Sequence, residues 1–121
     1  MGRTGLPARA GRSGSKHNSI VVESIIIETS RAQQAEAVGL LAAVADPVRW
    51  RLVAELAGHG TRCVCDLQPV SGVAPNVLSY HLKVLRDAGI VLATRRGRWV
   101  DYTLRADAVE RLHRALPGGA S

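Results

Sequence analysis

The residues of this 121-residue chain that stand out chemically are two cysteines one residue apart, Cys63 and Cys65. As the only cysteines, they cannot build a disulfide framework, and nothing in the sequence points to an oxidising compartment. Taken singly, a cysteine is most often a small buried hydrophobic residue. The sequence has no Cys-x-x-Cys motif and no glycine-rich cofactor loop after a strand, which argues against an oxidoreductase or another enzyme. We therefore expect a cytoplasmic protein that is not an enzyme.

Positive charge is concentrated in two blocks. The net charge is +6, and residues 1–19 hold four basic residues and no acidic one. Residues 61–105 hold seven basic residues against three acidic ones. This distribution favours a polyanionic partner such as nucleic acid, although an arginine-rich composition raises the net charge without any function.

The composition indicates one small soluble domain. Hydrophobic residues make up 46% of the chain and charged residues 21%, and the apolar runs are too short to span a bilayer. Residues 1–19 are rich in Gly, Arg and Ser and cannot bury enough surface to offset their ordering entropy. We predict a disordered basic arm at 1–19, a folded domain at 20–116 and a flexible tail at 117–121. Residues 20–27 are β-branched and leave open a short strand or a helix lead-in.

The sequence between residues 31 and 89 predicts several helices, one after another. Residues 31–45 have a helix-favouring composition, and Asp46 with Pro47 predicts a second helix start, with Asp46 as its N-cap. A short helix is expected over residues 63–70. Pro75 opens a further helix over residues 75–88, ending at Gly89.

The helix at 75–88 is predicted to have two distinct faces. Its leucines Leu78, Leu82 and Leu85 fall on one face. The opposite face carries Asn76, Ser79, Tyr80, Lys83 and Asp87, with His81 on its flank. The Asn and Ser side chains suit base edges, whereas Lys and Tyr can reach either bases or phosphates, so we predict DNA contacts from these residues and His81, but not from Asp87. On periodicity alone, an ordinary solvated face is the favoured interpretation.

Two strands are predicted next, over residues 90–94 and 99–104, followed by a last helix at 106–116. The turn between the strands holds Arg95, Arg96, Gly97 and Arg98, with Gly97 supplying a positive φ. A helix–turn–helix followed by an arginine-tipped hairpin predicts a winged helix–turn–helix, a mainly α fold with a small β-hairpin. In this fold the second helix enters the major groove and the wing approaches the backbone or minor groove.

Four motifs occur in order at 45–56, 63–67, 78–91 and 95–104: ADPVRWRLVAEL, CVCDL, LSYHLKVLRDAGIV and RRGRWVDYTL. Together they resemble the ArsR/SmtB family of winged-helix metalloregulatory repressors over about residues 33–115. The resemblance implies an α-α-α-α-β-β-α homodimer whose first and last helices form the interface. It also implies binding to double-stranded operator DNA and release of that DNA by metal.

The CVCDL motif resembles most the arsenic and antimony branch of that family, which implies that Cys63 and Cys65 bind As(III) or Sb(III) as effector. Soft thiolates suit such ions, and two thiolates per subunit would also suit mercury. Because residues two apart lie about 200° apart on a regular helix, both sulfurs could reach one ion only if the first turn deforms. Such a deformation would be a plausible switch.

The sequence departs from that pattern at several positions. Relatives often have a third cysteine where this chain has Gln68, so the third ligand is left to water, a small thiol or a group such as His59. Ala74-Pro75 replaces the usual Ser-Gln start of the DNA-reading helix, which puts the operator sequence in doubt. The spacing of Asp107, Glu110 and His113 does not match the family's site on the last helix, so we interpret them as a solvated face.

The sequence leaves alternatives to a metal-released repressor. The same repressor could respond to oxidants through its Cys-x-Cys pair, or be insensitive to metal. An arsenite methyltransferase or thiol oxidoreductase lacks its motifs here, as stated above. A protein-interaction module of the same fold would not need the three wing arginines, Arg95, Arg96 and Arg98.

Overall fold

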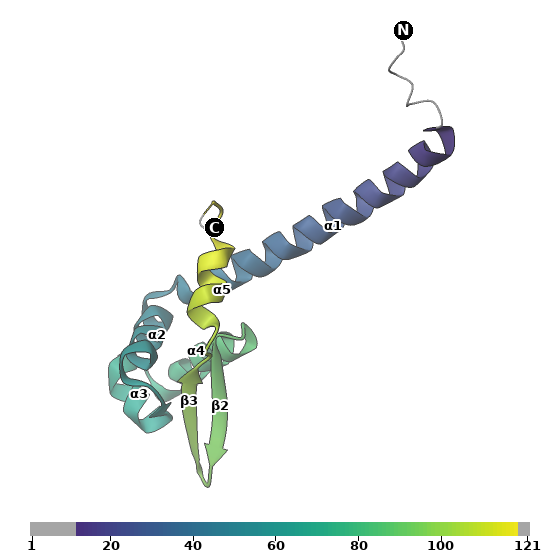
Figure 1. The fold of residues 1–121 in the computed structure, drawn as a ribbon. Coiled ribbons are helices and arrows are strands. Elements are labelled where there is room, and N and C mark those ends of the chain that lie inside the picture. Colours follow the sequence, from purple (N-terminus) through teal and green to yellow (C-terminus); the bar gives the residue numbers. More distant parts are fainter. Residues whose placement is uncertain (1–11, 119–121) are drawn as a thin grey trace. The chain divides into compact units, whose positions relative to one another are not determined.

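The computed structural model describes residues 12–118, with side-chain surroundings from residue 22 onward. The chain divides into two units, Met1–Ala35 and Glu36–Ser121, which are described separately. Its elements are, in order, α1 (Arg12–Val44), α2 (Pro47–His59), β1 (Arg62–Cys63), α3 (Val64–Ser71), α4 (Pro75–Asp87), β2 (Val91–Arg96), β3 (Trp99–Leu104) and α5 (Ala108–Ala115) (Figure 1).

The first unit contains most of helix α1. Residues 12–19 of the predicted basic arm belong to this helix, residues 1–11 lie outside the described residues, and the division at residue 19 stays a prediction. Residues 20–27, left open between strand and helix, also belong to α1. The helix-favouring residues at 31–45 continue the same helix, and β-strand propensity is a weak prior that such a context overrides. No helix in the described part of the chain is long and apolar enough to cross a membrane.

The start of α2 follows the prediction from Asp46 and Pro47. The Asp46 carboxylate accepts hydrogen bonds from the backbone N–H groups of Val48 (2.9 Å) and Arg49 (3.1 Å). These bonds, first of all the one from Arg49, hold the pKa of the Asp46 carboxyl below its usual value. The cap satisfies backbone donors that a helix start otherwise leaves unpaired.

Helix α4 ends at Asp87, one residue before the predicted end. The C-cap residue is Ala88, and Gly89 follows it with a φ of 74°, in the left-handed region that glycine adopts most readily. The helix itself covers Pro75–Asp87, close to the predicted 75–88.

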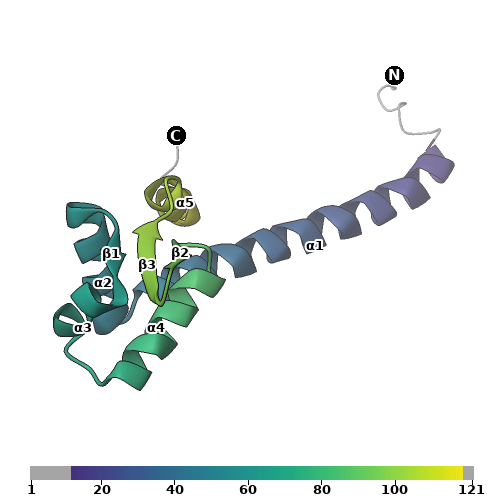
Figure 2. The ribbon, with the colours of Figure 1, turned by 90° about the horizontal axis from the view of Figure 1, so that it is seen from below.

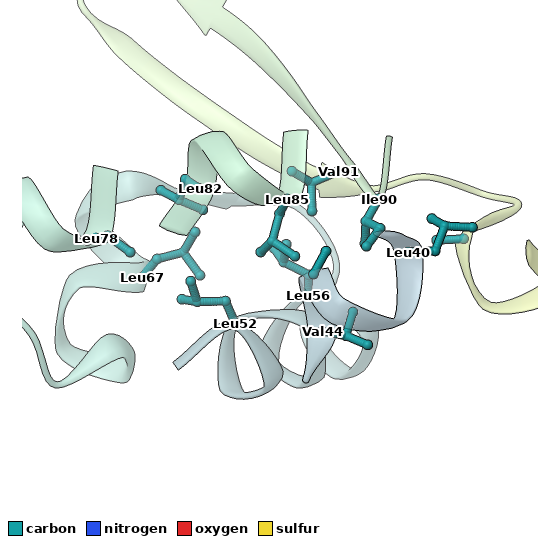
Figure 3. Close-up of a cluster of buried hydrophobic side chains, with 12 residues drawn as sticks. Leu40, Val44, Leu52, Leu56, Leu67, Leu78, Leu82, Leu85, Ile90 and Val91 are labelled. Atoms are coloured by element: carbon teal, nitrogen blue, oxygen red, sulfur yellow. The ribbon is translucent and has the colours of Figure 1, made fainter. Parts of the chain in front are cut away.

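The core forms on the leucine face of α4, as predicted (Figure 3). Leu78, Leu82 and Leu85 are at most 1% exposed. The same hydrophobic cluster includes buried leucines of α2 and α3: Leu52, Leu56 and Leu67. Ile90 and Val91, just after α4, belong to it at the base of the hairpin, and its remaining members come from the end of α1 and the start of α5: Leu40, Ala43, Val44 and Ala108. This packing fixes which face of α4 points outward.

A three-stranded antiparallel sheet has the order β1-β3-β2. Strands β2 and β3 form the predicted hairpin, with Arg96 opposite Trp99, so the turn is Gly97-Arg98 and Gly97 has a φ of 63°. Strand β1 was not predicted, because two residues are too few to show a period of two. It pairs Arg62 with Tyr102 and Cys63 with Asp101 of β3.

The last helix is shorter than the predicted 106–116. Of its apolar residues, Leu112 is partly buried against the core, whereas Val109 and Leu116 are about half exposed. The predicted helical spacing is therefore present, but it does not bury these two residues within a single chain. The predicted tail and the boundary at residue 20 stay predictions; Pro117 and Gly118 form a turn, and residues 119–121 lie outside the described residues.

We expect Leu85→Ala to reduce the free energy of unfolding by about 2–5 kcal/mol, because it removes a fully buried side chain and leaves a cavity. Leu92→Ala is the matched control, because Leu92 is 50% exposed, and it should lower that free energy by about 1 kcal/mol or less. Urea denaturation followed by circular dichroism measures both values. Equal losses would contradict the assignment of α4's leucine face to the core.

Candidate functional site

The two cysteines lie at the junction of β1 and α3. Cys63 is the last residue of β1 and the N-cap of α3, with extended φ and ψ of −78° and 163°. Cys65 lies in the first turn of α3, and in this structure the two sulfurs are joined by a disulfide, with the Cα atoms 5.2 Å apart. The expectation that the helix must deform to bring the sulfurs together is wrong, because Cys63 is outside the helix and its side chain follows the strand geometry instead.

Asp66 completes a reciprocal cap around Cys63. The Asp66 backbone N–H donates to the Cys63 Sγ (3.3 Å), and the Cys63 N–H donates to the Asp66 Oδ2 (3.4 Å). Such a capping box satisfies two backbone donors at once. Cys63 is therefore held in place by the start of α3 as well as by β1.

The groups around the sulfurs decide which side chains could join them as ligands. Among the described residues, the group whose donor atoms lie within 4.8 Å of one another is Cys63, Cys65 and Asp66, of which Cys63 is buried and the others exposed. Sequence reasoning missed Asp66, although its place three residues after an N-cap was a usable signal.

The sequence candidates for a third ligand are engaged elsewhere. His59 ends α2 and its Nδ1 lies 3.3 Å from the Glu55 Oε2, which the Arg62 Nε also approaches at 3.3 Å. The Gln68 side chain donates to the Val73 carbonyl (2.6 Å), which ties the end of α3 to the turn before α4. Gln68 is therefore a turn-stabilising residue.

The turn between α3 and α4 is held by several further bonds. The Ser71 hydroxyl donates to the Gln68 carbonyl (2.8 Å) and accepts from the Val73 N–H (3.2 Å). The Arg51 Nη2 of α2 donates to the Ser71 carbonyl (2.9 Å). Gly72 takes a left-handed φ of 68° at the C-cap of α3. These contacts fix how α4 leaves α3, as a helix–turn–helix requires.

The outward face of α4, which follows α3 after a short connecting segment (Figure 2), agrees in its exposed residues with the two-faced helix expected from the sequence. Four of its predicted DNA-contacting residues are exposed: Asn76, Ser79, Tyr80 and Lys83. Lys83 forms an ion pair on its own helix, with its Nζ 2.7 Å from the Asp87 Oδ2. That hydrogen bond is the main reason why the pKa of the Asp87 carboxyl lies below its usual value. The DNA-contacting roles of these side chains stay predictions.

His81 differs from its predicted place on the flank of that face. Its side chain is buried, with the Nδ1 2.9 Å from the Arg49 Nη1 and 3.9 Å from the Asp46 Oδ2. Because a guanidinium only donates, the Nδ1 is the acceptor of this hydrogen bond. The Arg49 Nε also donates to the Ala43 carbonyl (2.6 Å). His81 thus anchors α4 to the start of α2, and periodicity could not separate such an anchor from a surface residue.

The three wing arginines, Arg95, Arg96 and Arg98, are all exposed at the hairpin tip, but they are not equivalent. Arg96 makes a two-pronged pair with Asp101, from Nε to Oδ2 at 2.8 Å and from Nη2 to Oδ1 at 3.1 Å. This pair raises the pKa of Arg96 and lowers that of Asp101. Arg95 donates to the Gly97 carbonyl (3.3 Å), and neither it nor Arg98 has an ion-pair partner within the described residues.

The carboxylates of the last helix pair with arginines close by. The Glu110 Oε2 lies 2.7 Å from the Arg114 Nη2, and the Asp107 Oδ1 lies 3.1 Å from the Arg105 Nε. Side-chain hydrogen bonding to Arg105 lowers the pKa of Asp107. His113 is exposed and, within the described residues, is not part of a group of potential metal ligands.

Comparison with known proteins agrees with this arrangement. The family described as "Bacterial regulatory protein, arsR family" matches residues 46–92. The arsenical resistance operon repressor of Bacillus subtilis is 40% identical over 70 residues, which cover 58% of this chain and 67% of that protein. The arsenic resistance transcriptional regulator ArsR1 of Pseudomonas putida is 35% identical over 62% of this chain and 59% of its own length.

A solved structure shows the same fold. The crystal structure of a possible transcriptional regulator for arsenical resistance is 33% identical and has a TM-score of 0.56, covering 60% of this chain and 75% of that one. Its likeness confirms the winged helix–turn–helix predicted from the sequence, to which the structure adds β1.

Replacing Arg95, Arg96 and Arg98 together with Ala should weaken binding to operator and random DNA alike, because phosphate contacts carry affinity rather than sequence information. Each arginine can neutralise one phosphate, so we expect the slope of log affinity against log salt to fall by up to about 3, and the share of Arg96 to be the smallest because it is paired with Asp101. Fluorescence anisotropy over a salt series measures this slope. Arg114→Ala, an exposed arginine paired with Glu110 on α5, is the control. Normal binding by the triple variant would exclude the wing as a contact surface.

Asn76→Ala and Ser79→Ala should each reduce discrimination between operator and scrambled DNA by about 1–3 kcal/mol, because both side chains are exposed on α4 and can bond base edges. Non-specific affinity should change less. Competition binding with the two DNAs gives the ratio, and the wing variant should leave that ratio unaltered. An unchanged ratio in both helix variants would move sequence readout to other residues or to DNA shape.

Proposed function

This chain belongs to the arsR family of bacterial regulatory proteins, and we propose that it is a transcriptional repressor released from its operator by As(III) or Sb(III) bound to Cys63 and Cys65. The observation that carries the effector is the placement of both sulfurs together at the junction of β1 and α3. Cys65 is exposed, so a dissolved oxyanion or hydroxide of the metalloid has access. Transcription regulators are not an enzyme class, and the site needs no catalytic step.

The donor set fits a thiophilic ion once the disulfide is reduced. A thiol reductant converts the disulfide to two thiols and is itself oxidised to a disulfide. The two thiols then displace two hydroxides from arsenous acid: two S–H and two As–O bonds break, two As–S bonds form, and two waters leave. Soft sulfur ligands favour such an ion over hard cations.

Two short structural routes lead from the cysteines to the proposed DNA surface. Along the chain, α3 runs directly into the turn held by Ser71 and then into α4. Across the sheet, Cys63 faces Asp101 of β3, and Asp101 holds Arg96 at the wing. A change in position of Cys63 therefore acts on neighbours of both DNA-facing elements. This supports release by a ligand that favours one arrangement over the other.

We also propose that the repressor acts as a homodimer on a two-fold operator in the cytoplasm. Apolar side chains on α1 and α5, Val38, Val109 and Leu116, are each about half exposed in the single chain. A second copy covering them would bury this surface, consistent with an interface formed by the first and last helices. Two copies would place two α4 helices on successive major grooves.

A second trigger has an observation in its favour, namely the disulfide between Cys63 and Cys65. A peroxide would form it by taking two electrons and two protons from the thiols, giving two waters. The same repressor would then respond to oxidation instead of, or as well as, a metalloid.

We expect Cys63→Ser and Cys65→Ser to keep operator binding within about 2-fold but to lose release by arsenite. Serine is a good N-cap, so Cys63→Ser preserves the start of α3 while removing a soft ligand. A mobility-shift assay on the gene's own upstream DNA, with a phosphine reductant, compares arsenite, antimonite, cadmium and zinc.

The same assay separates the two triggers. Dissociation of both serine variants by arsenite would place the sensing site elsewhere. If the wild type ignores arsenite under reductant but releases DNA after peroxide treatment, and a serine variant does not, the oxidant is the trigger.

A further inference from the structure

His81 is a buried titratable residue of α4, and its ring is bound by a residue from outside that helix. The residue is 8% exposed, and its Nδ1 accepts a hydrogen bond from the Arg49 Nη1 of α2 at 2.9 Å. The Arg49 Nε donates to the Ala43 carbonyl at 2.6 Å. One guanidinium therefore joins α4 to α2 and to the last turn of α1, and its contact with α4 depends on a ring nitrogen that can take up a proton.

A carboxylate lies close to the same ring nitrogen. The Asp46 Oδ2 is 3.9 Å from the His81 Nδ1, and it also accepts two backbone N–H groups as the N-cap of α2. Tyr80 of α4 packs edge-on to the ring, with the ring centres 5.2 Å apart. Within the described part of the chain, no charged group besides Arg49 and Asp46 lies within hydrogen-bonding or ion-pair distance of the ring. The protonation state of Nδ1 therefore decides between a cationic donor and an anionic acceptor.

We propose that His81 is a pH-sensitive positioning residue, whose neutral ring holds α4 in place for DNA and whose protonation releases that hold. This inference rests on the DNA binding proposed above. A neutral imidazole can accept the Arg49 N–H, whereas a protonated one donates from both nitrogens and leaves the guanidinium without an acceptor. The proton comes from solvent, and the one covalent bond that forms is N–H. Imidazole is the side chain that ordinarily changes charge between about pH 5 and 8, which sets the range to test.

Protonation also brings a different contact within reach. A proton on Nδ1 would face the Asp46 Oδ2, and a hydrogen bond of ordinary length requires the two atoms to approach by about 1 Å. The Asp46 carboxyl stays charged in mild acid, because its backbone hydrogen bonds, first of all the one from Arg49, keep its pKa below the usual value. The acid form thus exchanges the contact that joins α4 to α2. Because α4 and the wing must meet one DNA together, we expect DNA to select the form with the Arg49 contact.

The sign of the pH dependence separates this role from a direct DNA contact. A histidine that touches phosphate gains attraction when it is protonated, so operator binding would strengthen as the pH falls. The exposed histidines His59 and His113 can act by charge only in that direction. The positioning role of His81 predicts the reverse, with the highest affinity where its ring is neutral and a loss of affinity as the pH falls.

Operator affinity at two pH values tests this role. The full chain, reduced with a phosphine, is titrated onto the gene's own upstream DNA at about pH 5.5 and about pH 7.5, at constant ionic strength, and followed by fluorescence anisotropy. The test variant is His81→Asn, whose amide oxygen can take the place of Nδ1 as acceptor but does not titrate. The control is His59→Asn, which removes an exposed histidine that pairs with Glu55. Nitrogen-15 NMR of the imidazole rings follows the protonation of His81 in the absence of DNA.

We expect the wild type and His59→Asn to bind on the order of 10-fold more weakly at the lower pH, the scale of one hydrogen bond to a charged group, and His81→Asn to change by less than about 2-fold. Tighter wild-type binding in acid, or an equal loss in His81→Asn, overturns the inference. So does a His81 ring that keeps one protonation state across this range by NMR, whether or not the variant folds. Wild-type binding that does not depend on pH removes this inference and leaves the proposed function standing, whereas no operator binding at either pH removes both.

Discussion

The burial of one face of α4 is the constraint on which the functional surface depends. Because Leu78, Leu82 and Leu85 pack against α2 and α3, the helix cannot rotate about its axis without exposing them. The hydrogen bond between Arg49 and His81 adds a polar lock at the same interface, and Arg49 also holds the end of α1 through the Ala43 carbonyl. The outward face of α4 is therefore a consequence of the core, and its polar residues need no contacts of their own to be positioned.

The role proposed for the cysteine site depends on its position one short helix before α4. Cys63 belongs to the sheet through β1 and to the helical layer as the cap of α3. A sulfur at such a junction can affect both the wing and the helix–turn–helix, whereas a sulfur in the middle of a helix would act on one element. The exposed Cys65 and Asp66 make the junction accessible, while the buried Cys63 ties it to the interior.

The sequence predicts those features that follow from periodicity or from single-residue chemistry. The leucine stripe of α4, the Asp46 cap and the positive φ of Gly97 all belong to this class, and the structure confirms them. The sequence does not predict features that depend on tertiary pairing. Strand β1 has only two residues, and His81 anchors α4 because its ring lies beside Arg49 of α2. The cysteines are a further case of this kind. The prediction assumed helix geometry for Cys63, but this residue is the last one of β1.

The pairing of exposed cations on α4 and the wing with carboxylates has a further electrostatic consequence. Lys83 with Asp87 and Arg96 with Asp101 are exposed pairs, and such pairs contribute little to stability because water and salt screen them. A cation in such a weak pair can exchange its carboxylate for another anion at little cost, and a phosphate suits a guanidinium well in charge and bidentate geometry. If these residues contact DNA as predicted, each pair must open when the phosphate binds, so the carboxylates reduce the net gain from each contact without preventing it.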